Sequence, residues 1–221
     1  MFSHKIQDLP NLSTITKNGK RYYVTPEGNS YPSVTTILSS LQKPIGLTEW
    51  RDNIGHEKAD RYTQVRANRG EAVHLLCERY VRNEENILRG AMPDVMGIFR
   101  NMKPYLNKIS LIYSIEAQLY CDQYKFAGRC DVIGKYMEAP AIIDFKTNSM
   151  SVDETPEKII HYALQLAAYS IAWKERTGED IDWGVLIFGS NEHGARAFKM
   201  PLTKYKERFI MIAKEFNDGN H

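Results

Sequence analysis

Residues 124–147 read YKFAGRCDVIGKYMEAPAIIDFKT, and this stretch decides which fold the chain can adopt. It contains two runs rich in β-branched and aromatic residues, 124–136 and 141–147, which the turn-prone residues Met137–Pro140 separate. Runs of this composition on either side of a short turn are typical of neighbouring antiparallel strands. The stretch therefore predicts two paired strands.

The second of these strands carries an acid and a base on one face. Side chains alternate between the two faces of a strand, so Asp144 and Lys146 point the same way, while Ile143 and Phe145 enter the opposite layer. The turn brings Asp131 of the first strand close to them. An acid two residues from a lysine is also common on solvated strands, and Asp131 could merely cap the hairpin turn. Both interpretations stay open at this point.

Two converging carboxylates would have a chemical consequence. Bringing like charges to about 4 Å costs on the order of 4 kcal/mol at an effective dielectric constant near 20, so the pair needs a cation or a proton between its members. Carboxylate and carbonyl oxygens are hard ligands that suit Mg²⁺ or Mn²⁺, with water and substrate phosphate completing the shell. Lys146 beside such a site could pair with a phosphate group.

The rest of the chain is arranged around this stretch in three parts. Residues 1–32 contain Asn18-Gly19 between β-prone runs, which indicates a tight hairpin, and residues 33–108 predict successive helices. Residues 109–221 predict an α/β core. Helix breaks are expected near Pro44, Gly55, Gly90 and Pro93. Further core elements are expected as a strand over 109–121, a helix over 155–176, strands over 182–190 and 195–201, and a helix over 203–216.

Length and composition favour a single soluble domain spanning 1–221. The 221 residues are 43% hydrophobic and 25% charged, and no apolar run reaches the roughly 18 to 20 residues of a membrane span. The N-terminus lacks the apolar stretch of a signal peptide, so we expect the protein in the cytoplasm and away from membranes. A net charge of +2 does not by itself indicate a nucleic-acid partner.

The three cysteines, Cys77, Cys121 and Cys130, form no CxxC pair. Neither a disulfide framework nor a four-thiolate zinc or iron-sulfur site is supported by this pattern. We therefore expect no iron-sulfur cluster.

The helix expected over 155–176 is apolar almost all round and therefore buried. Its Gln165 and Tyr169 lie four residues apart, on nearly the opposite side from the apolar stripe. A buried amide and phenol need hydrogen-bond partners, which could be the acids, Lys146 or a bound nucleotide. An ordinary core Gln and Tyr would meet the same description.

Histidine and glutamate residues elsewhere give weaker signals. His74 lies at the edge of an apolar helix stripe, where a packed histidine is commoner than a metal ligand, although its ring could reach a metal on the sheet. Glu116 alternates correctly to share the acidic face, but its register against Asp131 cannot be fixed from sequence. His161 and His193 show no partner spacing and are interpreted as structural.

Four elements stand in order along the chain: RGEAVH at 69–74, GRCD at 128–131, IIDFKT at 142–147 and QLAAY at 165–169. Together they resemble the pattern of the PD-(D/E)XK nuclease superfamily, specifically its RecB-like branch. YPSVTTIL at 31–38 and Glu116 narrow the resemblance within that branch. The family fold would be a restriction-endonuclease-like core, with a mixed central sheet flanked by helices.

The resemblance implies an exonuclease that degrades single-stranded DNA from free ends with Mg²⁺ or Mn²⁺. Asp131, Asp144, the Phe145 carbonyl and His74 would hold the metal, and Lys146 would be the catalytic lysine. The further catalytic candidates are Gln165, Tyr169 and Glu116.

Candidate DNA-binding residues are Ser33, Arg69, Arg129, Gln165 and Tyr169. We expect single-stranded DNA as the partner, together with replication or recombination proteins. We expect the protein in a bacterial cell, where the gene could be that of a phage. Two alternatives remain: a structure-selective or nicking endonuclease on the same core, and a catalytically silent protein that binds DNA ends.

Overall fold

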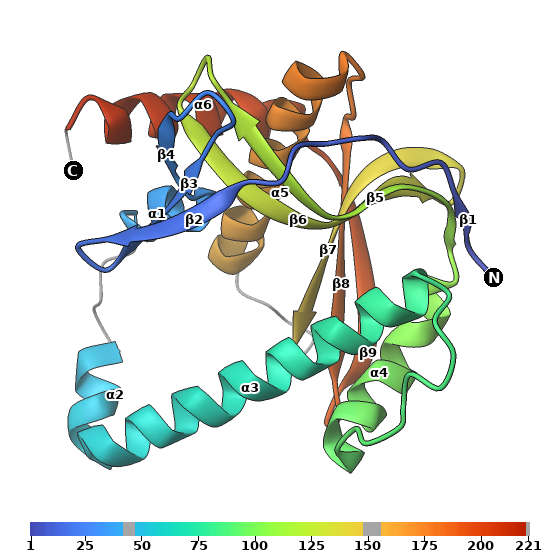
Figure 1. Ribbon diagram of the computed structural model, residues 1–221. Helices are drawn as coiled ribbons and strands as arrows, with labels where there is room; N and C mark the ends of the chain where they lie inside the picture. The colour runs from blue at the N-terminus through green and yellow to red at the C-terminus, as the bar shows by residue number, and fades with distance from the viewer. Residues whose placement is uncertain (42–46, 148–155, 220–221) are drawn as a thin grey trace.

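The centre of the molecule is a six-stranded sheet in the order β1-β5-β6-β7-β8-β9 (Figure 1). The structure is a computed structural model that describes residues 1–41, 47–147 and 156–219. The strands are β1 (Ser3–His4), β5 (Ile109–Cys121), β6 (Phe126–Tyr136), β7 (Ala139–Thr147), β8 (Trp183–Ser190) and β9 (Gly194–Pro201). β5, β6 and β7 are antiparallel, β7 and β8 run parallel, and β8 and β9 are antiparallel. The predicted α/β fold with a mixed central sheet is confirmed.

The turn between β6 and β7 is shorter than predicted. Met137 and Glu138 adopt positive φ angles of 48° and 68°, the conformation of a two-residue hairpin turn. Pro140, expected in the turn, instead pairs with Lys135 inside the ladder. β7 then connects to its parallel neighbour β8 through helix α5 (Pro156–Thr177), as a parallel pair requires.

A second, small sheet lies at the N-terminus. It consists of β2 (Ser13–Lys17), β3 (Lys20–Val24) and β4 (Ser30–Pro32). Asn18 and Gly19 have φ angles of 50° and 72°, so the predicted hairpin is confirmed. Leu12 and Tyr23 pack on Tyr120 and Ala127 of β5 and β6. The pairing of β1 with β5 was not predicted, because two residues carry no strand pattern.

The region expected to be helical contains four helices in its described part. They are α1 (Val34–Ser39), α2 (Leu47–Ile54), α3 (His56–Val81) and α4 (Pro93–Leu106). A further helix, α6 (Thr203–Asn217), follows β9. Gly55, at a φ of 87°, separates α2 from α3, and Pro93 opens α4, as predicted. The break expected at Pro44 lies outside the described residues.

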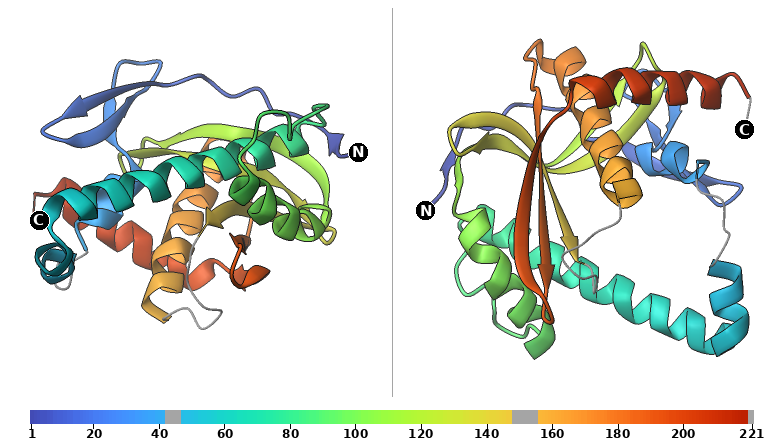
Figure 2. Two further views of the ribbon diagram at one scale, coloured as in Figure 1. Left: turned by 90° about the horizontal axis from the view of Figure 1, so that it is seen from below. Right: turned by 180° about the vertical axis from the view of Figure 1, so that it is seen from behind.

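Helices cover both faces of the central sheet (Figures 1 and 2). α5 packs on one face with α1 and α6, in a core that includes Phe126 and Trp173. The C-terminal half of α3 packs with α4 on the other face, in a core that includes Phe99 and Phe145. Within the described ranges, none of the helices combines the length and the apolar character that crossing a membrane requires. The strands that carry the predicted acids therefore lie between two apolar layers.

Candidate active site

The ladder between β6 and β7 stops just before the two predicted acids. Its last pair joins Val132 and Ile143, so the next residue on each strand is Asp131 and Asp144. Beyond that pair the Phe145 N–H donates to Asp131 Oδ2 at 2.7 Å. We call this position, formed by Asp131, Asp144 and Phe145, the strand fork. The two acids lie on adjacent antiparallel strands, as the sequence predicted.

Asp144 is the more deeply buried acid of the strand fork. It is 2% exposed, and its Oδ2 lies 2.5 Å from Lys146 Nζ. Among the described residues this oxygen has no partner that meets hydrogen-bond geometry. Burial raises the pKa of Asp144 to about 6; the Lys146 ammonium opposes this rise, and the Asp131 carboxylate adds to it. A cation placed here would stabilise the buried carboxylate.

Asp131 of β6 forms an ion pair with His74 of helix α3 when the histidine ring is protonated. His74 Nδ1, on α3, lies 3.4 Å from Asp131 Oδ2. Burial disfavours the Asp131 carboxylate, but His74, Lys146 and the Phe145 N–H outweigh it and lower the pKa of Asp131 below its usual range. Burial likewise disfavours the charged His74 ring, yet Asp131 raises the pKa of His74. The structure therefore brings His74 into the strand fork.

Lys146 connects the strand fork to α5. Its ammonium donates to Gln165 Oε1 at 3.4 Å, and Gln165 Nε2 donates to the Tyr169 hydroxyl at 3.0 Å. Tyr169 is 3% exposed, and burial raises its pKa well above the usual value. Of the partners that the sequence left open for Gln165, the structure shows the lysine.

Two glycines of the sequence motifs allow close approach at this site. A Cβ on Gly128 would lie 2.7 Å from Tyr169 Cε1, and a Cβ on Gly70 would lie 3.0 Å from Thr147 Oγ1. Real Cβ atoms are essentially never found at the first distance and rarely at the second. The motif glycines thus let α5 and α3 pack tightly against β6 and β7.

Glu116 lies across the ladder from Asp131. Its neighbours on β5 pair with the residues that flank Asp131, and Glu116 itself has a φ of 56°, in the left-handed region that non-glycine residues rarely adopt. Its Oε2 is 2.8 Å from Nε of Arg129. Burial, followed by the Asp131 carboxylate, raises the pKa of Glu116 to about 7. Glu116 and the candidate DNA-binding residue Arg129 are thus neighbours at the edge of the site.

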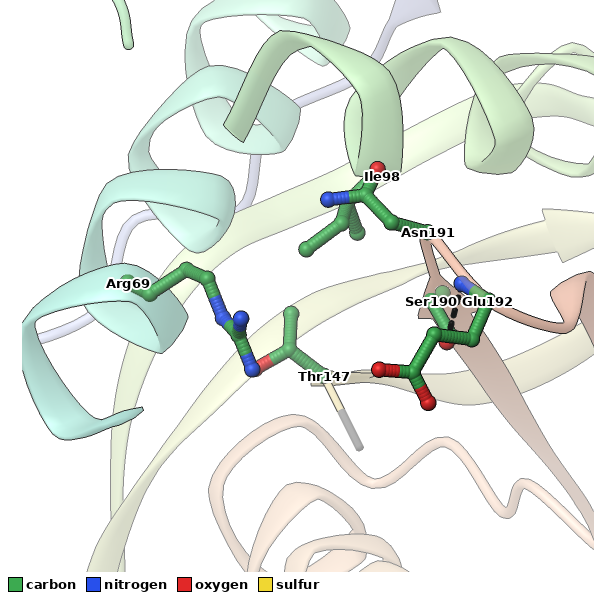
Figure 3. Close-up of a pocket in the computed structure, with 7 residues that line it drawn as sticks. Arg69, Ile98, Thr147, Ser190, Asn191 and Glu192 are labelled. Atoms are coloured by element: carbon green, nitrogen blue, oxygen red, sulfur yellow. Dashed lines mark hydrogen bonds between the residues drawn. The ribbon is translucent and has the colours of Figure 1, made fainter. Parts of the chain in front are cut away.

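A small notch lies at the end of β7 (Figure 3). Arg69 reaches from α3 toward Thr147, which directly follows Lys146 on β7 (Figure 3). The notch is lined by Arg69, Ile98, Thr147, Gly189, Ser190, Asn191 and Glu192. Arg69, predicted to bind DNA, therefore lies at the end of the strand that carries Asp144 and Lys146.

Ser33 has a structural role in the fold. Its hydroxyl accepts a hydrogen bond from the Thr36 N–H at 3.0 Å as the N-cap of α1, and Ser33 is 2% exposed. The N-cap role was predicted from the sequence. Its predicted contact with DNA stays a prediction from the motif alone.

Two residues of α5 near Lys146 were missed by sequence reasoning. The Lys146 ammonium lies 5.0 Å from the centre of the Tyr162 ring. Burial, with a smaller effect of the Lys146 charge, lowers the pKa of His161, which the sequence assigned to a structural role. His161 and Tyr162 lie four and three residues before Gln165, so their helical spacing to Gln165 was the available signal.

The donor groups of the strand fork fit a hard divalent cation. Asp131 accepts a hydrogen bond from the Phe145 main chain, and the buried Asp144 Oδ2 contacts the Lys146 ammonium without meeting hydrogen-bond geometry. In the described part of the chain, no three or more His, Cys, Asp or Glu side chains lie together in an arrangement that could hold a metal ion. Mg²⁺ does not require three such side chains, because it is usually held by one or two carboxylates with water and substrate phosphate.

Comparison with known proteins agrees with the geometry. Residues 111–215 match the sequence profile of the PD-(D/E)XK nuclease superfamily. That range contains both acids, Lys146, Gln165 and Tyr169. The predicted resemblance to this superfamily is confirmed over this range, which holds the strands and the helix that form the site.

Among individual proteins, the chain is similar to mitochondrial genome maintenance exonuclease 1 of the mouse, Mus musculus. The two are 26% identical over 207 residues, which cover 86% of this chain and 60% of the mouse protein. The crystal structure of a proposed exonuclease from Eubacterium rectale matches with a TM-score of 0.47 and 9% identity, over 69% of this chain and 65% of that one.

Proposed function

We propose that the protein is a metal-dependent exonuclease that hydrolyses phosphodiester bonds of single-stranded DNA from a free end. The observation that carries the proposal is the strand fork, where two carboxylates meet at the end of a ladder with Lys146 2.5 Å from one of them. Metal-assisted hydrolysis of a phosphodiester needs cation ligands and a positive charge near the phosphate. The strand fork offers both.

In this proposal Asp131, Asp144, the Phe145 carbonyl and His74 are the ligands of Mg²⁺ or Mn²⁺. When bound, the cation would polarise a phosphoryl oxygen and lower the pKa of a coordinated water. His74 already contacts Asp131 at 3.4 Å, so it also orients that carboxylate. We propose that no iron-sulfur cluster takes part.

The remaining catalytic candidates act around these ligands. Lys146 places its ammonium where negative charge develops on the phosphate. Gln165, hydrogen-bonded to Tyr169, holds Lys146 from α5. Glu116, with a pKa raised to about 7, can exchange a proton near neutral pH.

We propose that the DNA strand passes between the strand fork and an extension that we call the arm, α2 and residues 56–69 of α3. Figure 1 shows the first half of α3 running away from the central sheet, with α2 beside its start. Residues 56–68 are exposed except for Ala59. Exposed lysine and arginine side chains bind phosphates, and exposed aromatic rings can stack on nucleobases. The arm offers Lys58, Arg61, Arg66 and Arg69, and the Tyr62 ring lies 4.6 Å from the Arg66 guanidinium.

Cleavage of linear and circular strands in one tube tests the proposal. Purified protein is incubated with Mg²⁺ or Mn²⁺ and an equimolar mixture of end-labelled linear and closed circular single-stranded DNA of equal length. We expect the linear strand to disappear while the circle persists, and we expect the rate to fall steeply with salt.

Each other outcome points to a different function. Loss of circles at a rate comparable to linear strands would replace the exonuclease with an endonuclease. Binding of both strands without cleavage, in any divalent metal, would favour a silent DNA-binding protein.

We further propose that residues 1–221 work as a single nuclease domain. The pairing of β1 with β5 and the packing of Leu12 and Tyr23 on the core support this, because both attach the N-terminal region to the sheet. The cytoplasmic location, the phage or bacterial origin, and replication or recombination proteins as partners stay predictions.

A further inference from the structure

The ammonium group of Lys146 is enclosed by three different groups. Asp144 Oδ2 lies at 2.5 Å, Gln165 Oε1 at 3.4 Å, and the centre of the Tyr162 ring at 5.0 Å. An ammonium within about 6 Å of an aromatic ring centre is attracted to the ring face, and the attraction grows when water is excluded. The Lys146 side chain is only 18% exposed, so the contact is shielded from water.

The sheet holds the Tyr162 ring in place. Phe188 of β8 is the ladder partner of Lys146, and its ring meets the Tyr162 ring edge to face, with centres 5.8 Å apart. Phe198 of β9 packs on Phe188 in the same way, at 5.7 Å. A row of three rings therefore runs from β9 to Lys146, and the strand register fixes its position.

We propose that Tyr162 is a positioning residue whose ring face holds the Lys146 ammonium at its place beside the strand fork. This inference rests on the proposed nuclease function and deepens it. Asp144 attracts the same ammonium, yet in the proposed function Asp144 must also face the metal. A ring face attracts the ammonium without offering an oxygen that competes for a hard cation. The Lys146 ammonium is thereby held by a second contact that does not depend on the Asp144 carboxylate.

Two substitutions at Tyr162 separate the ring from its hydroxyl. Tyr162→Phe keeps the ring, and we expect kcat on linear single-stranded DNA within about twofold of wild type. Tyr162→Leu removes the ring, and we expect kcat to fall about tenfold to thirtyfold while KM stays unchanged. Trp183→Leu is the matched control, because it removes an exposed ring that lies 4.6 Å from a different lysine, Lys199, and it should keep wild-type kcat.

The Lys146→Ala background gives the sharper test. If Tyr162 acts through Lys146, adding Tyr162→Leu to Lys146→Ala should cause no further loss. An additional tenfold loss, or an equal loss in Tyr162→Phe and Tyr162→Leu, would overturn the inference. So would a fall of kcat in Trp183→Leu that matches the fall in Tyr162→Leu.

A measurement without turnover separates this inference from the nuclease proposal. In metal-free protein with isotope-labelled lysine, the Lys146 εCH₂ resonance, assigned by its loss in Lys146→Arg, should be shifted upfield by the ring. We expect the shift to persist in Tyr162→Phe and to vanish in Tyr162→Leu. An unshifted resonance in wild type overturns the inference even if DNA is cleaved, whereas a shifted one upholds the contact even in a protein that cuts no DNA.

Discussion

The strand fork and the arm use similar charged residues in opposite surroundings. In the strand fork Asp144 is 2% exposed and touches Lys146, and its pKa is raised to about 6. In the arm the ion pair between Arg51 and Asp60 has side chains 30% and 65% exposed. Water and salt screen exposed charges, whereas buried charges act strongly on one another. One substitution should therefore matter more in the strand fork, where charges are buried, than in the arm, where they are exposed.

Replacing a fork carboxylate should have the largest effect on cleavage. We expect Asp131→Ala or Asp144→Ala to lower kcat about a thousandfold or more, because each change removes an oxygen donor for the cation. Single-turnover cleavage at saturating Mn²⁺ measures this, with circular dichroism to show that the fold persists. The exposed Asp218 gives the matched control Asp218→Ala, which should cut normally. Wild-type rates in either fork variant would remove the fork from the mechanism.

Removing Lys146, which lies beside the strand fork, should separate metal binding from the chemical step. We expect Lys146→Ala to lose about a hundredfold to a thousandfold in turnover while it still binds the metal, since the ammonium acts on the phosphate. Calorimetric titration with Mn²⁺, set beside single-turnover rates, measures the two quantities. Equal loss of both would show that Lys146 only maintains the structure of the site.

The buried carboxyls predict a pH-dependent stability. The folded-state pKa values are raised to about 7 for Glu116 and about 6 for Asp144. A raised pKa stabilises the fold below the unfolded pKa, and this contribution is lost as pH rises through the folded value. In chelator we therefore expect the free energy of unfolding to fall by on the order of 2 kcal/mol between pH 5 and 8.

Thermal unfolding across this pH range tests the prediction. His74, whose pKa is also raised, changes stability in the same direction. Asp144→Asn should flatten the profile, and Mn²⁺ should restore stability at pH 8 in wild type. A flat wild-type profile in chelator would mean that the fork carries no unfavourable charge.

Single charges of the arm should have the smallest effects. We expect Arg61→Ala or Arg69→Ala to weaken single-stranded DNA binding about threefold at low salt and to reduce the salt slope, because each removes one phosphate contact. Fluorescence anisotropy in chelator measures binding without cleavage. Arg208→Ala is the matched control, because it also removes an exposed arginine, but one that lies on α6 and not in the arm. A hundredfold loss of DNA affinity in one arm variant would show that single residues matter as much in the arm as in the strand fork.

The sequence predicted the parts of the site that depend on local geometry. Asp144 and Lys146 share a face because strand side chains alternate, and Gln165 and Tyr169 lie on one side of α5 because residues four apart meet on a helix. Both expectations are confirmed in the structure. Their catalytic roles stay predictions.

Features that depend on long-range register could not be predicted. Glu116 takes a φ of 56°, which no local pattern signals, and the Tyr162 ring meets Lys146 only because α5 crosses β7 at one place. The β6–β7 loop was expected to include Pro140, since proline is common in turns, but positive φ at Met137 and Glu138 closes it sooner. Tertiary packing decides all three features.

Helix α3 joins the two regions as one continuous helix. It begins at His56 in the arm and carries His74 at the strand fork, a rise of roughly 27 Å at 1.5 Å per residue. Inserting one residue between them would turn the arm by about 100° around the helix axis relative to the fork. Inserting seven would nearly restore its angle while lengthening it by roughly 10 Å. The number of residues between His56 and His74 therefore sets both the distance of the arm from the strand fork and its rotation about the helix axis.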